Sequence, residues 1–354
     1  MNKRFVGELS AGAARYEAQK IAFGPMVFQC VRIAWKSGLL ARLDAATDGL
    51  SVAELATGHE LSGYAIGVLM ESCLSAGVVR LEQDRYLLDK IGHFVVHDRL
   101  TQVNLDFTND VCYRGLFQLE ESLRSGRPLG LATLGPWRSL YEGMTTMPEP
   151  ARGSWFSFDH YYSDSAFGAA LPFVLAGDPA RLLDVGANTG KWAEACLRAA
   201  PRLSVSLVDL APQLAMARDR LEAAGLLARA SLHTLDLLDP DAALPGGQDV
   251  VWMSQLLSCV GVPQIQSILA RARAALNDGG RLFVLDTFWD RQAHDAAAYC
   301  LINTSPYFTA IASGCGRMYR CDDYAACARE ARLLLTDVRD GIGLCHSLLT
   351  FVAA

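Results

Sequence analysis

Hydrophobic and polar residues recur with two different periods along this chain, and the change of period divides it. Over residues 11–48 the apolar positions are three or four residues apart, which is the spacing of a helix with one buried face. A second run of this kind follows Ser62; its apolar face comprises Ile66, Leu69, Met70, Cys73 and Leu74. Two short runs at residues 78–81 and 85–88 are typical of strands and flank three polar residues. The first hundred residues therefore predict helices followed by a small hairpin.

One helix start between these runs is marked by a local motif. Ser51-Val52-Ala53-Glu54 is a capping box, in which the serine caps the helix and the glutamate reaches back to it. A short helix over residues 53–56 follows. Helices followed by a hairpin form the plan of a winged-helix domain, predicted here for residues 1–100.

From residue 181 onward, short apolar runs alternate with helical stretches. The predicted parallel strands are Arg181–Val185, Ser204–Val208, Ala230–His233, Asp249–Met253 and Arg281–Leu285. Two further runs, Leu333–Val338 and Leu344–Val352, flank a glycine-containing turn and predict an antiparallel hairpin at the sheet edge. The fold class is therefore α/β, with a doubly wound, Rossmann-like sheet of seven strands in residues 173–354.

Residues 101–172 separate these two parts and are predicted to be a helical linker. Their aromatic residues are Phe107, Tyr113, Phe117, Trp137, Tyr141, Trp155, Phe156, Phe158, Tyr161, Tyr162 and Phe167. Most of these side chains are expected in a core, and some of them in a pocket for a flat small molecule.

Composition and charge exclude several classes of protein. The net charge is −6, and residues 62–76, which would be the recognition helix of a DNA reader, contain Glu71 but no lysine or arginine. We therefore expect no nucleic-acid partner, and a homodimer through the apolar first hundred residues. No apolar run has the length of a membrane span, and Met1-Asn2-Lys3-Arg4 does not begin a secretion signal, so a cytoplasmic location is expected.

The ten cysteines contain no Cys-x-x-Cys pair, and most lie in apolar surroundings. Cys315, Cys321 and Cys327 are evenly spaced but have no histidine nearby. Structural zinc sites have more closely paired ligands, so no metal site is expected.

The strongest local motif is Leu182-Leu183-Asp184-Val185-Gly186-Ala187-Asn188-Thr189-Gly190. A buried strand ends in an acid, and a glycine turn then leads into a helix, so a ligand can approach the backbone closely. A dinucleotide would require glycine at positions 188 and 191, but Asn188 and Lys191 stand there.

S-adenosylmethionine fits the motif better, because it has no phosphate. It requires an acid for its amino group, glycines beside its methionine tail, and acids for its ribose and adenine. Asp184, Gly186 and Gly190 meet the first needs. Asp209 ends the next strand and suits the ribose, and Asp236 follows the third strand and suits the adenine. The same loops add the candidates Asn188, Leu210, Leu237, Ser254 and Gln255.

Nearly the whole chain resembles the plant-type O-methyltransferase family, a class I S-adenosylmethionine-dependent group with bacterial members that act on small molecules. The resemblance rests on Gly38-Leu39-Leu40-Ala41-Arg42-Leu43, on the glycine loop, and on Leu235-Asp236-Leu237-Leu238, which is similar to the family's Gly-Asp-Met-Phe. It implies a homodimer that methylates a hydroxyl of an aromatic, polyene or polyketide-like small molecule. The cofactor contacts that it implies are Gly186, Asp209, Asp236, Leu237 and Ser254.

The chain departs from this family at the catalytic position. The family often has Leu-His-Asp-Trp after the fourth strand, and the histidine deprotonates the substrate; here Ser258 and Cys259 stand in place of His-Asp. A serine hydroxyl is no base near neutral pH, so this role cannot be carried over. The remaining candidates are His160, which lies among carboxylates and tyrosines, Asp286 at the end of the fifth strand, and His346 on the last strand.

Three functions remain open from the sequence. The first is O-methylation of a small molecule. The second keeps the cofactor but performs C-methylation or a reaction without methyl transfer, which the missing histidine would allow. The third is a non-catalytic winged-helix regulator, against which the cofactor acids and the acidic charge count.

Overall fold

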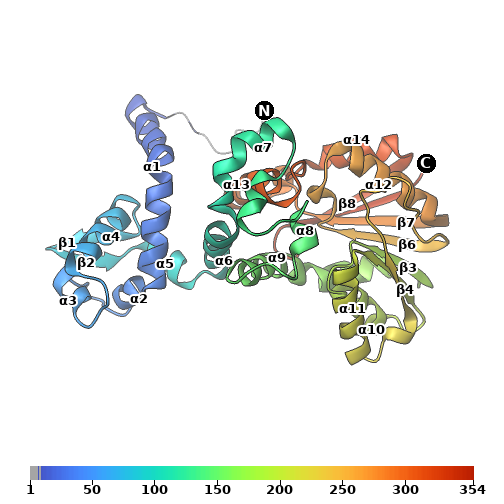
Figure 1. Cartoon of the computed structure of the whole chain (residues 1–354), viewed down its shortest axis with the longest axis horizontal. Coiled ribbons are helices and arrows are strands. Elements are labelled where there is room, and N and C mark those ends of the chain that lie inside the picture. The colour runs from blue at the N-terminus through green and yellow to red at the C-terminus, as the bar shows by residue number, and fades with distance from the viewer. Residues whose placement is uncertain (1–6, 8) are drawn as a thin grey trace. The chain divides into compact units, whose positions relative to one another are not determined.

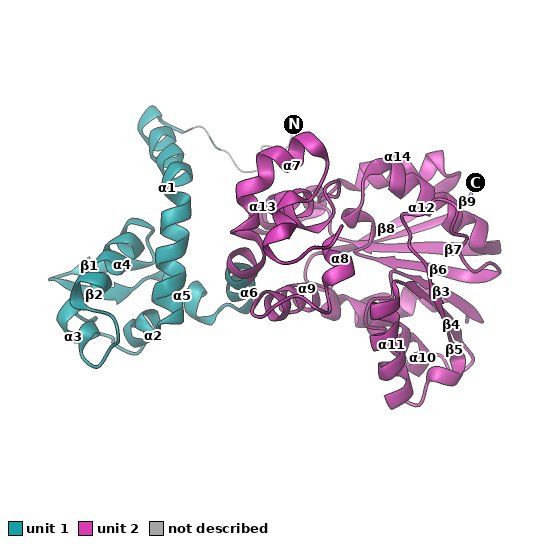
Figure 2. Cartoon of the chain, viewed as in Figure 1, with its two compact units in different colours: residues 1–106 teal, residues 107–354 magenta. Residues whose placement is uncertain are grey.

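The computed structural model describes Gly7 and residues 9–354, so the Met1-to-Arg4 start falls outside the described residues. The chain forms two compact units, unit 1 with residues 1–106 and unit 2 with residues 107–354 (Figure 2). Residues 107–172, the greater part of the expected linker, lie in the unit that contains the large sheet.

Unit 1 consists of helices and one hairpin. Its elements are α1 (Ala11–Lys36), α2 (Leu39–Asp44), α3 (Val52–Ala56), α4 (Gly63–Ser75), β1 (Val79–Glu82), β2 (Arg85–Leu88), α5 (Lys90–His97) and most of α6 (Arg99–Phe107) (Figure 1). The helix predicted over residues 11–48 is two helices, because Gly38 has φ +83°, a left-handed conformation that ends a right-handed helix. The capping box is confirmed, since Glu54 Oε2 accepts the Ser51 N–H at 2.7 Å.

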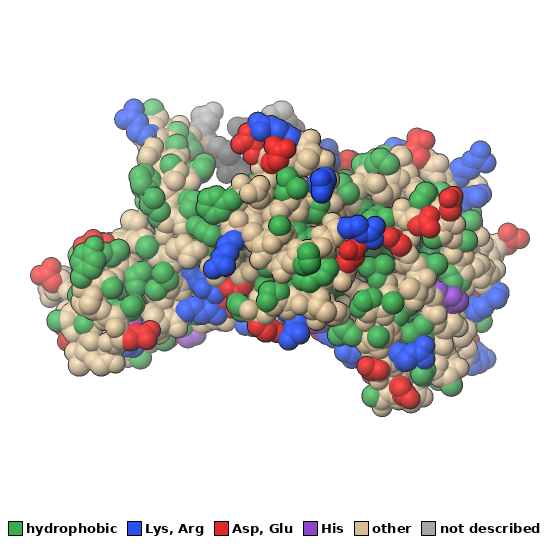
Figure 3. Space-filling view, in the orientation of Figure 1, with side chains coloured by type: hydrophobic (Ala, Val, Ile, Leu, Met, Phe, Trp, Pro, Cys, Tyr) green, Lys and Arg blue, Asp and Glu red, His purple; other side chains and the backbone are tan. Residues whose placement is uncertain are grey.

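Helix α1 has apolar side chains toward water as well as toward the core. Val31 and Ala34 pack with α2 and α4 in the core of unit 1. The exposed apolar residues of the helix are Tyr16, Ile21, Phe23, Met26 and Ile33. Figure 3 shows apolar side chains along this helix. An apolar surface of this kind is typical of a region that contacts a partner.

Unit 2 begins with helices and continues as an alternation of strands and helices. The first helices are α7 (Leu119–Ser125), α8 (Leu140–Gly143) and α9 (Ala151–Val174). The alternation comprises β3 (Arg181–Val185), α10 (Lys191–Ala199), β4 (Ser204–Asp209), α11 (Ala211–Ala223), β5 (Ala230–Thr234), β6 (Gln248–Ser254), α12 (Val262–Ala275), β7 (Leu276–Asp286), α13 (Asp295–Tyr307), α14 (Cys321–Glu330), β8 (Leu333–Ile342) and β9 (His346–Ala353).

The strands form the predicted seven-stranded sheet, in the order β5-β4-β3-β6-β7-β9-β8. Strands β3 to β7 are parallel, and β9 runs antiparallel to both β7 and β8. The chain order reverses between β3 and β6, so loops from neighbouring strands diverge at that point. In open α/β sheets ligands bind outside the carboxyl ends of the strands at such a reversal.

Helices cover both faces of this sheet (Figure 1). One core packs α12 and α14 against side chains such as Val251 and Leu349, and the other packs α9, α10 and α11 against side chains such as Trp252 and Leu182. Successive residues of a strand therefore pack into opposite cores. The parallel strands are apolar at nearly every position because both faces of the sheet are buried.

Candidate active site

The turn after β3 requires glycine at two positions. Gly186 has φ +77° and Gly190 has φ +73°, conformations that other residues rarely adopt. A Cβ atom on Gly190 would lie 2.9 Å from the Ala217 side chain, and one on Gly186 would lie 3.0 Å from Leu256. The N–H of Gly186 donates to Val208 O at 2.9 Å, which holds the turn against the end of β4.

Asp184 lies beneath this turn as a buried, incompletely paired acid. Its side chain is 2% exposed, and Oδ2 has no hydrogen-bond partner among the described residues. Burial, with a smaller contribution from the charge of Asp209, raises the pKa of the Asp184 carboxyl to about 8. Trp252 is its neighbour on β6 and stacks on Trp192 at 3.9 Å. A cationic group bound here would compensate the buried carboxylate.

Asp209 ends β4 and fastens the turn. Its carboxylate accepts the N–H of Asn188 at 2.8 Å and that of Leu210 at 2.7 Å. Burial raises its pKa, and these two hydrogen bonds oppose that effect. Each oxygen keeps a lone pair, so the carboxylate can also accept hydrogen bonds from ligand hydroxyls.

The remaining cofactor candidates follow β5 and β6. Ser254 ends β6, and no described residue hydrogen-bonds its buried Oγ atom. Gln255 follows with φ +50°, and its N–H donates to Leu285 O. Asp236 and Leu237 lie beyond β5, where Asp236 is exposed. The turn residues and Ser254 thus meet at the ends of adjacent strands, while Asp236 and Leu237 stand at the end of the outer strand.

Several polar side chains lie among aromatic residues beside the glycine turn, and one of them, Asp159, was not predicted from the sequence. Asp159 on α9 accepts from Asn188 Nδ2 at 3.3 Å. Burial, followed by the charge of Asp164, raises the pKa of Asp159 to about 6, yet water reaches 23% of its side chain. Burial, with a small contribution from the charge of Asp159, raises the pKa values of Tyr141 and Tyr307. Asp159 is therefore deeply enclosed but still accessible to a small molecule.

The hydroxyls and the thiol around Asp159 come from distant segments. Tyr307 OH accepts the indole N–H of Trp155 at 2.7 Å. The Cys259 thiol donates to Gln255 O at 3.4 Å, and burial raises the thiol pKa to about 12, so the thiol is neutral. Asp159 is four residues after Trp155 and three before Tyr162, both of which are buried. Aromatic residues occur all around α9, so the sequence alone did not single out this face.

His160 follows Asp159 on α9, and its Nδ1 atom lies 3.9 Å from Asp159 Oδ2. Its Nδ1 atom is 3.5 Å from Asp164 Oδ1, and Asp164 forms an ion pair with Lys191 at 2.7 Å. Its ring stacks on Phe156. Burial, then the charge of Lys191, lowers the His160 pKa. The imidazole is therefore neutral near pH 7 but lies beside an ion pair.

Asp286 lies beside Ser258, and its carboxylate is held by hydrogen bonds from the protein. Asp286 is buried and accepts Tyr324 OH at 2.7 Å and the Thr287 N–H at 2.8 Å. Burial raises its pKa to about 6, while these bonds and the neighbouring Ser258 lower it. The protein itself thus supplies two donors to this carboxylate, one of them from α14.

His346 is buried on β9. Neither ring nitrogen has a hydrogen-bond partner within the described part of the chain, and burial lowers the pKa of the imidazole to about 4. It is therefore a neutral side chain, and the structure does not bring it into the group around Asp159.

Comparison with known proteins agrees with this fold. A Dimerisation2-like domain model matches residues 15–86, and a methyltransferase domain model matches residues 183–282. Together with the sheet order and the acid-glycine turn, these matches define a class I S-adenosylmethionine-dependent methyltransferase, with S-adenosylmethionine as its cofactor. The order of the two domains, with a dimerisation domain before the catalytic domain, resembles that of the bacterial proteins related to the plant-type O-methyltransferases.

Its relatives perform more than one kind of methylation. The L-tyrosine C(3)-methyltransferase of Streptomyces lavendulae is 23% identical over 86% of this chain and 82% of its own length. The 3-hydroxy-5-methyl-1-naphthoate 3-O-methyltransferase of Streptomyces sahachiroi is 30% identical over 43% of this chain and 42% of its own. The structure of the S-adenosylmethionine-dependent methyltransferase SibL has a TM-score of 0.69 at 25% identity, over 95% of this chain and 98% of SibL. None of the described helices is both long and apolar enough to cross a membrane.

We expect Asp184→Asn to stabilise the ligand-free protein as the pH rises. The folded pKa of about 8 exceeds the ordinary aspartate value of about 3.9. Between these values the unfolded chain loses the proton that the folded protein keeps, so the free energy of unfolding falls by up to about 1.4 kcal/mol for each pH unit. The variant has no carboxyl to titrate, and its advantage in urea denaturation should grow between about pH 5 and pH 7.

Asp249→Asn is the matched control, because hydrogen bonds from Asn277 and from the Ala180 and Arg181 N–H groups lower the pKa of Asp249. This variant should be less stable than wild type above about pH 4, the opposite sign. If the free energy of unfolding depends on pH in the same way in Asp184→Asn and in wild type, Asp184 is not the acid whose pKa is raised by burial.

Proposed function

We propose that this chain transfers a methyl group from S-adenosylmethionine to a hydroxyl of an aromatic small molecule. The observation that supports this most is the hydrogen-bonded link from Asp209, at the glycine turn beside the buried Asp184, through Asn188 to Asp159, an enclosed acid among tyrosines and a tryptophan. The relatives named above act on tyrosine and a hydroxynaphthoate, and their substrates are aromatic and hydroxylated.

The described residues fit the cofactor. The unpaired Asp184 Oδ2 atom suits the ammonium group of its methionine part, and the free lone pairs of Asp209 suit its ribose hydroxyls. Ser254 offers an unsatisfied hydroxyl on the neighbouring strand. Asp236 and Leu237, beyond the outer strand, would contact the adenine. When bound, the cofactor supplies a methyl group already activated on a sulfonium, so the protein's part is to align the acceptor.

We propose Asp159 as the group that takes the proton of the substrate. With a pKa of about 6 it is ionised at neutral pH, and the Asn188 amide fixes one of its oxygens. A phenol has a pKa of about 10, so a carboxylate raised toward neutrality assists better than an ordinary one. His160 and Asp286 are the weaker alternatives, because His160 adjoins the Lys191–Asp164 pair and Asp286 is already hydrogen-bonded.

C-methylation is the second candidate, favoured by the L-tyrosine C(3)-methyltransferase, which matches 86% of this chain, and by the absence of a histidine at position 258. Removing the phenolic proton raises electron density on the oxygen and also on the adjacent ring carbons. A base at Asp159 would therefore serve both reactions, and the position of the acceptor relative to the methyl group would decide between them.

Incubating the enzyme with methyl-labelled S-adenosylmethionine and a panel of phenols, naphthols and hydroxybenzoates tests this function. We expect a labelled methoxy product in the carbon NMR spectrum, because the phenolate oxygen carries most of the charge. A labelled ring methyl would support C-methylation instead. If adenosylhomocysteine binds in calorimetry but no aromatic accepts the label, the proposed substrate class is wrong.

We expect Asp159→Asn to lower turnover by about 10²- to 10⁴-fold, the range for losing a general base. The acidic limb of the pH–rate profile near pH 6 should disappear, while the affinity for adenosylhomocysteine should change little. His160→Ala is the matched control on the next residue and should keep most activity, as should Ser258→Ala. The reverse pattern, with His160→Ala inactive and Asp159→Asn active, would assign the base to His160.

We also propose that the chain is a cytoplasmic homodimer joined through unit 1, with no nucleic-acid partner. The Dimerisation2-like match includes most of α1, whose exposed apolar residues would be covered by a second copy. All ten cysteines are free thiols, which suits a reducing compartment.

Light scattering should give twice the chain mass of 38.4 kDa for the wild type. The double variant Phe23→Glu/Met26→Glu should give the monomer mass, because it places charge within the apolar face. Leu344→Glu alters an exposed leucine of unit 2 and should remain dimeric. A wild-type mass of 38.4 kDa at micromolar concentration would contradict the dimer.

A further inference from the structure

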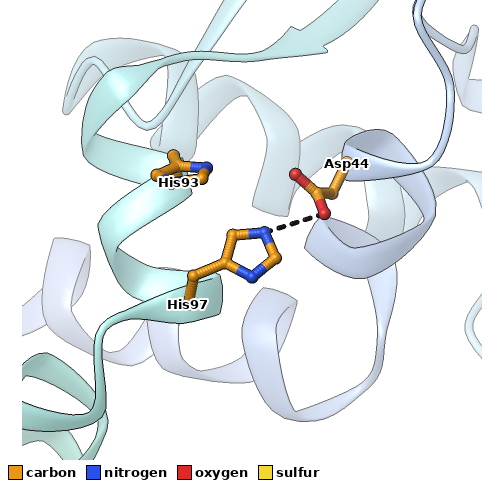
Figure 4. Close-up of side chains that lie close together, drawn as sticks. All are labelled: Asp44, His93 and His97. Atoms are coloured by element: carbon orange, nitrogen blue, oxygen red, sulfur yellow. Dashed lines mark hydrogen bonds and ion pairs between the residues drawn. The ribbon is translucent and has the colours of Figure 1, made fainter.

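Two histidines and a carboxylate of unit 1 are turned toward one another. His93 and His97 are one helical turn apart on α5, and Asp44 is the last residue of α2. Figure 4 shows the three side chains around a common space. His97 Nε2 lies 2.8 Å from Asp44 Oδ2, and the two imidazole centroids are 4.5 Å apart. One ligand atom from each residue lies within 4.8 Å of the others.

An ion pair explains only part of this arrangement. His97 and Asp44 would form such a pair without a second imidazole, and exposed ion pairs contribute little to stability. His93 makes no contribution to that pair, yet it lies at the i, i+4 position from which two side chains of a helix reach the same point. A bound ion would give all three side chains a shared partner.

We propose that Asp44, His93 and His97 bind a divalent transition-metal ion, with zinc as the favoured ion. Imidazole nitrogen and carboxylate oxygen are both zinc ligands, with bonds of about 2.0–2.2 Å. In a tetrahedral site such bonds place the ligand atoms about 3.3 Å apart. The present spacings, from 2.8 Å to at most 4.8 Å, bracket this value. All three residues are exposed, so small side-chain rotations complete the site, and water takes the fourth position.

The ion would connect the end of α2 to the end of α5, within the unit that carries the dimerisation domain. Nothing in the proposed methyl transfer uses it, so its role is to fasten two helices. The spacing of the cysteines predicted no metal site. Asp44 lies far from the histidines in sequence, and only the fold brings the three together.

Untagged full-length protein, freed of metal with a chelator, is titrated with zinc chloride in a calorimeter without cofactor or substrate. We expect one zinc ion per chain. His93→Ala and His97→Ala should each weaken binding at least about 10-fold, since losing even an outer-shell partner costs that much. His294→Ala removes an exposed histidine of unit 2 and should leave zinc affinity unchanged.

The substituted side chains are exposed, and circular dichroism checks that the variants fold. Cobalt supplies a second readout, because a tetrahedral site gives it strong visible absorption that Asp44→Asn should weaken. Equal zinc affinity and stoichiometry in wild type and in the His93→Ala/His97→Ala double variant would place the ion elsewhere and overturn the proposal. Neither readout involves methyl transfer, so this proposal stands or falls independently of the proposed function.

Discussion

Two carboxyl groups at the carboxyl ends of β3 and β4, the buried Asp184 and the partly buried Asp209, impose the condition on which the rest of unit 2 depends. Asp209 receives two backbone N–H groups, so its burial is partly compensated. Asp184 Oδ2 receives none from the described residues, and the charge of Asp209 adds to its cost. Stability is lowered at a place where a cation can restore it, which is the usual relation between a strained polar site and its ligand.

The sequence predicted most of the sheet and these strand ends because both are encoded locally. Strand β3, the acid that it contains and the glycines that follow it are neighbours in the chain, and φ values near +75° at Gly186 and Gly190 leave little choice of residue. Which face of α9 is buried could not be predicted in the same way. Apolar and aromatic residues occur all around that helix, so no clear stripe identifies its buried face. Histidine is the more common base, so the sequence favoured His160 over its neighbour Asp159.

The loss of the family histidine also has a structural explanation that the sequence alone did not supply. Ser258 lies beside Asp286 and lowers the pKa of its carboxyl, and Tyr324 on α14 donates a hydrogen bond to the same carboxylate at 2.7 Å. The acid beside Ser258 is therefore already engaged by α14. An acid so engaged is poorly suited to exchange protons with a substrate, and base chemistry is better placed on a different element, α9.

Asn188 joins the two halves of the site, and its residue type follows from two independent demands. Its φ of +47° is left-handed, which asparagine tolerates better than most residues other than glycine. Its backbone N–H donates to Asp209, and its side-chain amide donates to Asp159. Glycine would satisfy the backbone but supply no amide, and glutamine would supply the amide with a poorer fit to this backbone. Asn188 thus holds Asp209 and Asp159 in a fixed relation. In the proposed site, the turn that would bind the cofactor would therefore also set the alignment on which methyl transfer depends.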